Sequence, residues 1–171
     1  LVMEHVTELP ENIKEYFIVL KKDGEKFVDV TGEQKSKTGN YYLFKKTFYG
    51  KSPWHGGYSY VDLLIPGVTE KFIDVTMTGY EKSIGDEFGK LVPGIFTDEP
   101  NINPPGGTKF TPALFDDFEG KWGYDLKTNL PSLFDEIGDW RVVRHNYQAL
   151  LLELFIDRWS KPWFEYTEKH N

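Results

Sequence analysis

The alternation of apolar and polar residues near the start of the chain predicts a β-hairpin. Residues 16–20 and 26–30 are rich in β-branched and aromatic side chains, and the turn pair Asp23-Gly24 lies between them. An Asp-Gly pair between two such runs is typical of a tight hairpin turn. The polar residues 31–40 have glycines near both ends and predict a loop. Residues 1–40 are therefore expected to form a hairpin and a loop that lead into the rest of the chain.

The next part of the pattern predicts two strands separated by a helix. Residues 41–48 alternate imperfectly between apolar and polar positions, which indicates a half-buried strand. Residues 66–78 begin with a proline that suits a first helical turn and then place three apolar side chains on one face. Residues 91–96 are mostly apolar and predict a strand buried on both faces. This spacing favours parallel pairing and a right-handed βαβ unit, and hence α/β architecture.

Helices are predicted in the last third of the chain. Residues 112–122 and 130–136 have short helical patterns, and residues 139–158 carry a broad apolar stripe at helical spacing. Pro162 is expected to end or kink this last helix. The spacing of the aromatic residues that follow indicates that the helix then resumes. The pattern continues to the final residues, and the first residue is not Met, so both ends are expected to be cut.

Composition and charge narrow the classes of partner. Aromatic residues make up 16% of the 171 residues, a supply that suits stacking on sugars, although any single ring is more simply explained by the core. The net charge of −7 argues against nucleic acids and anionic membranes as partners. No apolar run approaches the roughly 20 residues of a membrane span. Without cysteine the sequence does not fix a compartment, and a secreted or periplasmic location is compatible with it.

Two adjacent carboxylates, Asp98 and Glu99, follow the predicted strand at residues 91–96. The loops at the carboxyl ends of parallel strands build active sites in α/β folds. A carboxylate held beside apolar residues is partly desolvated and can keep the proton that a general acid needs. Glu99 has the longer reach, and Pro100 biases it toward an extended backbone. The alternatives are a solvated strand end and a metal site, but neighbours on a strand point to opposite faces and cannot easily share one ion.

A second group of candidates lies in residues 50–62, which mix glycine, proline and serine with aromatic residues. Such a composition is expected where a loop shapes a site. Asp62 is the candidate second carboxylate, although an acid just before a helix also suits the helix dipole. The aromatic residues are candidates for sugar binding or, equally, for a packed cluster over the strand ends: Trp54, His55, Tyr58 and Tyr60.

Several of these motifs together resemble a known enzyme family. They are Pro53-Trp54-His55-Gly56-Gly57-Tyr58, then Tyr60-Val61-Asp62-Leu63-Leu64, and Pro93-Gly94-Ile95-Phe96-Thr97-Asp98-Glu99-Pro100. The chain from about residue 41 to 171 resembles the barrel of large bacterial glycoside hydrolases similar to family 106, the α-L-rhamnosidase group. The resemblance implies that residues 41–171 form part of a (β/α)8 TIM-type barrel behind the N-terminal β-hairpin. A full barrel needs about 250 residues, so the chain is expected to be a barrel fragment.

The same resemblance implies an activity. Glu99 matches the proton donor at the end of the fourth barrel strand, and the partner carboxylate would lie on a later strand outside this chain. The remainder of the barrel would come from the same gene or from another chain. The expected substrate is an oligosaccharide or polysaccharide, with an α-L-rhamnoside as the family-level expectation. No cofactor is expected from the residues, while the resemblance suggests calcium without assigning its ligands.

Two other functions stay open at this point. The aromatic content and the incomplete barrel are also compatible with a non-catalytic carbohydrate-binding or structural module. A metal-dependent hydrolase of esters or phosphates would need a His-rich ligand spacing. The four histidines, at positions 5, 55, 145 and 170, do not show that spacing. The leading hypothesis is a glycosidase that uses Glu99 as its acid.

Overall fold

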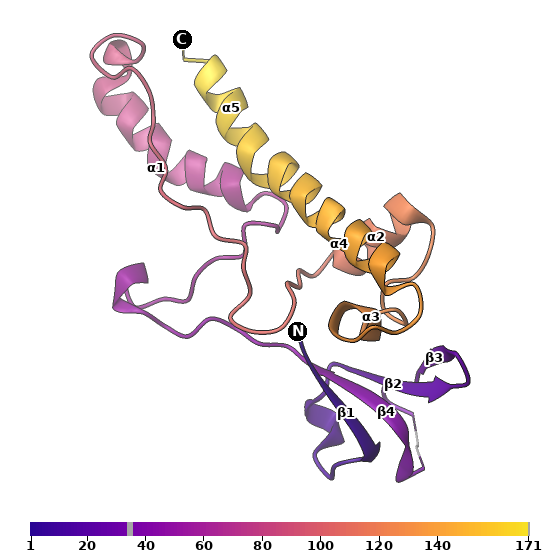
Figure 1. The fold of residues 1–171 in the computed structure, drawn as a ribbon. Helices are drawn as coiled ribbons and strands as arrows, with labels where there is room; N and C mark the ends of the chain where they lie inside the picture. The colour runs from indigo at the N-terminus through magenta and orange to yellow at the C-terminus, as the bar shows by residue number, and fades with distance from the viewer. Residues whose placement is uncertain (34–35, 171) are drawn as a thin grey trace. The chain divides into compact units, whose positions relative to one another are not determined.

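The computed structural model describes residues 1–33 and 36–170, which form a mixed α/β structure (Figure 1). Residues 34 and 35, within the predicted loop at 31–40, and residue 171 lie outside the described residues. The chain divides into two compact units. Unit 1 comprises Leu1–Tyr60 and Asn103–Leu150, and unit 2 comprises Val61–Ile102 and the residues from Leu151 onward. Each unit is described by itself below.

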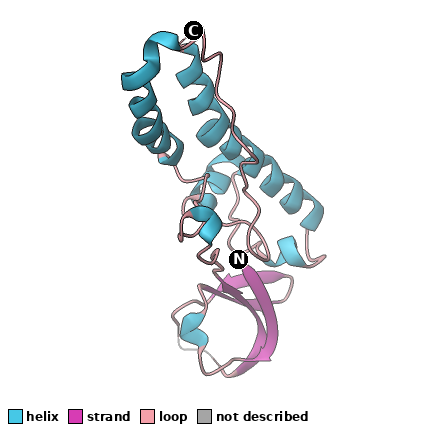
Figure 2. Cartoon of the chain, turned by 90° about the vertical axis from the view of Figure 1, so that its left-hand side faces the viewer, coloured by secondary structure: helices cyan, strands magenta, loops and turns pink. Residues whose placement is uncertain are grey.

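Unit 1 contains an open, antiparallel sheet with the strand order β1-β4-β2-β3, drawn in magenta in Figure 2. Its strands are β1 (Val2–Glu8), β2 (Ile18–Asp23), β3 (Lys26–Asp29) and β4 (Thr38–Lys45). The predicted hairpin is confirmed, because β2 and β3 pair up to Asp23 and Lys26. Gly24 takes a φ of 59° in the turn between them, a conformation that glycine adopts without steric cost.

Strand β4 is buried on both faces and is the centre of the unit 1 core. Its residues Tyr41, Tyr42, Leu43 and Phe44 are at most 4% exposed. Tyr41 and Leu43 belong to a cluster on one face that also holds Tyr16 and Val19. On the other face the ring of Phe44 lies 5.9 Å from that of Phe134. The predicted strand at 41–48 is thus confirmed over residues 41–45, where it is more deeply buried than its half-polar pattern indicated, whereas residues 46–48 lie outside the strand.

The helices of unit 1 contribute most of the remaining buried apolar side chains of the unit. They are α2 (Leu114–Trp122), α3 (Pro131–Phe134) and the first part of α4 (Trp140–Phe155), which confirms the helices predicted in these regions. The buried side chains they share with their connecting turns are Leu114, Phe118, Leu126, Leu130, Tyr147 and Leu150. The hydroxyl of Tyr147 donates to the carbonyl of Lys109 at 2.7 Å. Burial raises the pKa of Tyr147, so this phenol stays protonated.

Unit 2 is built around α1 (Val68–Ile84) and α5 (Lys161–Glu168), which lie side by side (Figures 1 and 2). A π-helical turn, Ile156–Ser160, joins α4 to α5, so the helix that was predicted to resume is found, and the regular α-helix is interrupted just before Pro162, not ended by it. Pro162 has no N–H to donate to the carbonyl of Arg158, four residues earlier. The buried hydroxyl of Thr69 donates to that carbonyl at 2.6 Å. The irregular turn therefore fastens α1 to the C-terminal helix.

The predicted parallel βαβ unit is wrong. Strand β4 pairs antiparallel with both of its neighbours, and one of these, β1, was not predicted. Residues 91–96 form no strand in the structure, and only Val92 among them is partly covered. Pro93 lacks a donor for a sheet and Gly94 lacks a side chain to pack, which explains why this short apolar run stays irregular. Within the described residues the sheet is open and no barrel closes.

Among the described residues, none of the helices combines the length and the apolar character that crossing a membrane requires.

Candidate functional site

The catalytic candidates Asp98 and Glu99 lie in an irregular segment of unit 2, and both are exposed. The strand whose end was expected to desolvate Glu99 is not formed. Glu99 instead has a φ of 21°, and it is the only residue other than glycine with a positive φ in the described chain. Such a backbone is costly for a residue with a side chain, and costly conformations cluster at functional sites. The structure therefore marks Glu99 as unusual, while its catalytic role stays a prediction.

The segment that precedes Glu99 forms one wall of a pocket of about 570 Å³ within unit 2. Residues 92–98, up to and including Asp98, line this wall. The opposite walls come from α1, from the turn after it and from the C-terminal helix. Their aromatic members are Phe72, Tyr80, Phe88, Trp159, Trp163 and Tyr166. We call this cavity the aromatic pocket.

The rings of the aromatic pocket contact one another mainly edge to face. Trp163 lies 5.9 Å from Phe72 and 6.0 Å from Trp159, measured between ring centroids. The sequence showed the spacing of the Trp and Tyr residues along one helix. It gave no signal that Phe72, about 90 residues earlier, would face them, because that contact depends on how α1 packs.

His170 lines the aromatic pocket and links the end of the C-terminal helix to α1. Its Nε2 lies 2.7 Å from a carboxylate oxygen of Glu81 in α1, and its Nδ1 lies 2.9 Å from the carbonyl of Tyr166. Both partners are acceptors, so both ring nitrogens can donate only when the imidazole is protonated. The bond to the Tyr166 carbonyl and then the bond to Glu81 raise the pKa of His170, outweighing partial burial and the charge of Lys169. In the sequence His170 showed only that it lacks the spacing of a metal ligand.

The stability of unit 2 is expected to depend on pH through His170. A folded pKa above the unfolded value of about 6.5 adds stability that is complete below that value and is lost as pH rises through the folded pKa. His170→Gln should therefore lower the midpoint of thermal unfolding at about pH 5.5 and change it less at about pH 9. The exposed His145, which lies in α4, gives the control His145→Gln. A difference between wild type and His170→Gln that stays constant with pH would contradict this role.

The aromatic candidates of the loop at residues 50–62 lie together in unit 1. Trp54 is part of a single 3-10 turn, Pro53–His55, and its N–H is capped by the hydroxyl of Ser52 at 3.2 Å. Trp54 is 89% exposed and Tyr58 is 75% exposed. The ring of His55 packs on that of Tyr60 at 5.2 Å. His55 and Tyr60 therefore contact each other, Trp54 and Tyr58 are exposed, and the role of these four residues in sugar binding stays a prediction.

Asp62 lies in unit 2 and has a structural partner. Its carboxylate accepts the N–H of Leu64 at 3.1 Å, in the turn before α1. This fits the reading of Asp62 as an acid ahead of a helix. Asp62 does not line the aromatic pocket, and its role as second carboxylate stays a prediction.

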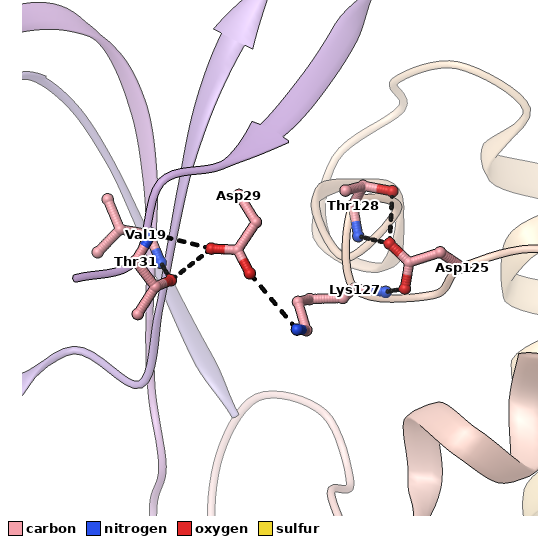
Figure 3. A network of polar contacts seen from close by, with 6 residues as sticks. All are labelled: Val19, Asp29, Thr31, Asp125, Lys127 and Thr128. Carbon is pink, nitrogen blue, oxygen red and sulfur yellow. Dashed lines mark hydrogen bonds and ion pairs between the residues drawn. The ribbon is translucent and has the colours of Figure 1, made fainter. Parts of the chain in front are cut away.

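Two carboxylates of unit 1, Asp29 and Asp125, are held in place by hydrogen bonds and an ion pair (Figure 3). Asp125 accepts the N–H of Lys127 and both the N–H and the hydroxyl of Thr128. The ammonium of Lys127 lies 3.4 Å from Asp29, which also accepts two bonds from Thr31. Burial alone would raise the pKa of Asp29, but the bonds from Thr31 and the charge of Lys127 hold it below its usual value. Such a carboxylate stays ionised and is unsuited to donating a proton.

The described residues offer no preformed metal centre, since no three His, Cys, Asp or Glu side chains among them are clustered as ligands. The calcium suggested by the resemblance therefore has no assigned ligands.

Comparison of the chain with protein-family models, with curated proteins and with solved structures gave no match.

Proposed function

We propose that the protein is a glycoside hydrolase in which Glu99 is the general acid. The observation that carries this proposal is the aromatic pocket, because the segment that leads into Glu99 forms one of its walls. Pockets with apolar walls and a few convergent polar groups are where small-molecule ligands bind. Glu99, which is exposed and has an unusual backbone, directly follows Asp98, a lining residue of that pocket. The resemblance to the family 106 glycoside hydrolases supports the same role.

The chemistry would follow the two-carboxylate scheme of glycosidases. Glu99 gives its proton to the glycosidic oxygen while the bond between that oxygen and the anomeric carbon breaks. A second carboxylate attacks the anomeric carbon or activates the water that does. Asp98 and Asp62 are the candidates within this chain. If the chain is part of a (β/α)8 barrel, as the resemblance implies, a residue of another barrel strand is the third candidate.

A panel of aryl glycosides tests this proposal, with α-L-rhamnosides included as the family-level expectation. We expect the protein to release the phenol from at least one sugar of the panel and to hydrolyse natural oligosaccharides or polysaccharides that end in that sugar. Turnover that resists a chelator would argue against a metal-dependent mechanism. If no glycoside is hydrolysed, even by the protein in its natural full length, the proposal fails.

The loop around Trp54 favours a second candidate function, which is carbohydrate binding without catalysis. Exposed aromatic faces such as those of Trp54 and Tyr58 can stack on the C–H faces of a sugar ring. This function does not require Glu99 or the aromatic pocket, so it can be tested separately.

Trp54→Ala is expected to weaken oligosaccharide binding about tenfold, because a lost stacking contact of roughly 1.4 kcal/mol corresponds to that factor. Its thermal unfolding should stay within about 1 °C of wild type, since the ring is 89% exposed. Titration calorimetry with a panel of plant and bacterial oligosaccharides measures the effect. Phe48, also in unit 1 and 80% exposed, gives the control Phe48→Ala. Equal affinities in all three proteins would exclude Trp54 from sugar binding.

A further inference from the structure

Two polar groups in the aromatic pocket are buried and have no hydrogen-bond partner within the described chain. They are the indole N–H of Trp163 and the hydroxyl of Tyr166, on one face of α5, and both residues line the cavity. Burial and then the charge of Glu81 raise the pKa of Tyr166, so its hydroxyl keeps the proton it can donate. Both side chains are only partly covered, so a small rotation brings each donor to the cavity surface. Buried donors without acceptors are unfavourable, and a ligand oxygen would relieve that cost.

Other polar groups of the lining come from the remaining walls. Tyr80, on α1, is 55% exposed and brings a hydroxyl, and Trp159 brings a second indole N–H. The wall formed by residues 92–98 contributes Asp98, an exposed residue whose carboxylate can only accept when ionised. The cavity therefore offers donors from two helical segments and an acceptor from the irregular segment, among aromatic surfaces such as that of Phe72.

This combination disfavours three simple classes of ligand. A hydrocarbon would leave the donors of Trp163 and Tyr166 unpaired. An anion could accept from them, but the carboxylate of Asp98 would repel it, and the charge of His170 is already paired with Glu81. A cation would pair with Asp98 but would bring no acceptor to the indole and the phenol. The ligand that suits the lining is neutral, has several groups that both donate and accept, and has an apolar face.

We infer that the aromatic pocket binds one neutral sugar ring of the substrate, an inference that rests on the proposed glycosidase function. Hydroxyl groups of the sugar accept from Trp163 and Tyr166 and donate to Asp98, while a C–H face of the ring lies on an aromatic side chain such as Phe72. The volume of about 570 Å³ lies within the range of small-molecule sites. Glu99 is not part of the lining, so binding of this ring does not depend on it.

An NMR titration that follows the indole N–H of Trp163 tests the inference without any need for catalysis. The probes are the methyl glycosides of rhamnose, glucose and galactose, and the signal of Trp163 is assigned as the one that Trp163→Phe lacks. We expect at least one of these neutral sugars to shift this signal, with a dissociation constant below roughly 10 mM. Methyl glucuronide carries a carboxylate and should bind at least tenfold more weakly than the glucoside, because Asp98 repels it.

Trp163→Phe keeps an aromatic ring but removes the N–H, and it should weaken binding of the best neutral sugar about tenfold. Trp122→Phe is the matched control, because Trp122 in unit 1 also has a buried indole N–H without a partner but does not line the pocket. It should leave the affinity unchanged. The indole signal of Trp159 remains in both variants and reports the affinity. Tyr166→Phe, which loses only a hydroxyl, gives the same test if the unfolding midpoint of Trp163→Phe falls.

The outcomes separate this inference from the proposed function. If none of the neutral sugars shifts the Trp163 signal, or if Trp163→Phe binds as tightly as wild type, the inference is wrong. A shift of the Trp54 signal alone would also overturn it and would place sugar binding in the loop of unit 1. If a neutral sugar binds in the pocket but no glycoside is hydrolysed, the proposed function fails and the sugar site stands. If glycosides are hydrolysed with the same KM by wild type and Trp163→Phe, the proposed function stands and the inference fails.

Discussion

Glu99→Gln is expected to lower the kcat of glycoside hydrolysis by a factor of roughly 10² to 10⁴, the usual contribution of a general acid. Glutamine has nearly the same shape but no acidic proton, so the departing oxygen would leave as an anion. The side chain of Glu99 is exposed, so its replacement should leave the unfolding midpoint unchanged. The decisive comparison is between a 4-methylumbelliferyl glycoside and the 2,4-dinitrophenyl glycoside of the same sugar. The second leaving group needs little protonation, and its hydrolysis should be much less impaired.

Glu119→Gln is the matched control for this experiment. Glu119 is an exposed glutamate of α2 in unit 1, away from the segment of Asp98 and Glu99 along the chain. We expect its replacement to leave both rates unchanged. An equal loss with both leaving groups in Glu99→Gln would show that Glu99 does something other than donate a proton. An unchanged rate would remove Glu99 from the mechanism altogether.

The sequence pattern correctly predicted the elements that are determined by residues close together in the chain. The Asp-Gly turn specified the β2–β3 hairpin, and the stripe along residues 139–158 specified α4. Even the irregular turn before α5 was foreshadowed by Pro162, because a missing N–H disturbs any helix. These features depend on residues within a few positions of one another.

The elements that depend on distant partners were missed or misread. Strand β1 begins at Val2, and its polar residues Glu4 and His5 gave it no clear alternation. It is a strand because β4 offers it a free edge. Residues 91–96 have the apolar character of a buried strand, but in the described chain their only strand-like pairing is an isolated bridge between Val92 and the nearby Phe88, so they form no strand. Apolar runs this short do not by themselves determine a strand.

The candidate site also combines a feature that nearby residues reveal with features that depend on residues far apart in the sequence. Glu99 was proposed from its motif, and the structure adds a backbone conformation that no sequence pattern reveals. The aromatic pocket needs Phe72 and Trp163 to come together from two helices. The contact of His170 with Glu81 joins residues 89 positions apart, so the sequence gave no sign of it. Sequence reasoning therefore supplied the candidate acid, whereas only tertiary structure supplied the cavity lined by the segment that precedes it.

Gly107→Ala is expected to have the largest effect on stability. Gly107 has a φ of 65°, and an added Cβ would lie only 1.8 Å from the carbonyl oxygen of Leu1. That carbonyl accepts the N–H of Thr108 at 2.8 Å, so the backbone at the start of β1 cannot move away without losing a bond. The left-handed conformation alone costs a residue with a side chain roughly 1–2 kcal/mol. With the steric overlap added, we expect the free energy of unfolding to fall by about 2–4 kcal/mol.

Gly106, the neighbouring glycine, provides the matched control for this prediction. A Cβ at Gly106 would meet only the side chain of Val2, at an ordinary contact distance of 3.8 Å, and its φ is not positive. Gly106→Ala should therefore change stability by less than about 1 kcal/mol and could even stabilise, because alanine has less freedom in the unfolded chain. Urea denaturation of the two variants beside wild type measures the difference. If both variants unfold at the same urea concentration as wild type, the approach of residue 107 to the first residue of the chain does not hold the sheet in place. If only Gly107→Ala is destabilised, residue 107 and Leu1 are in fixed contact within unit 1.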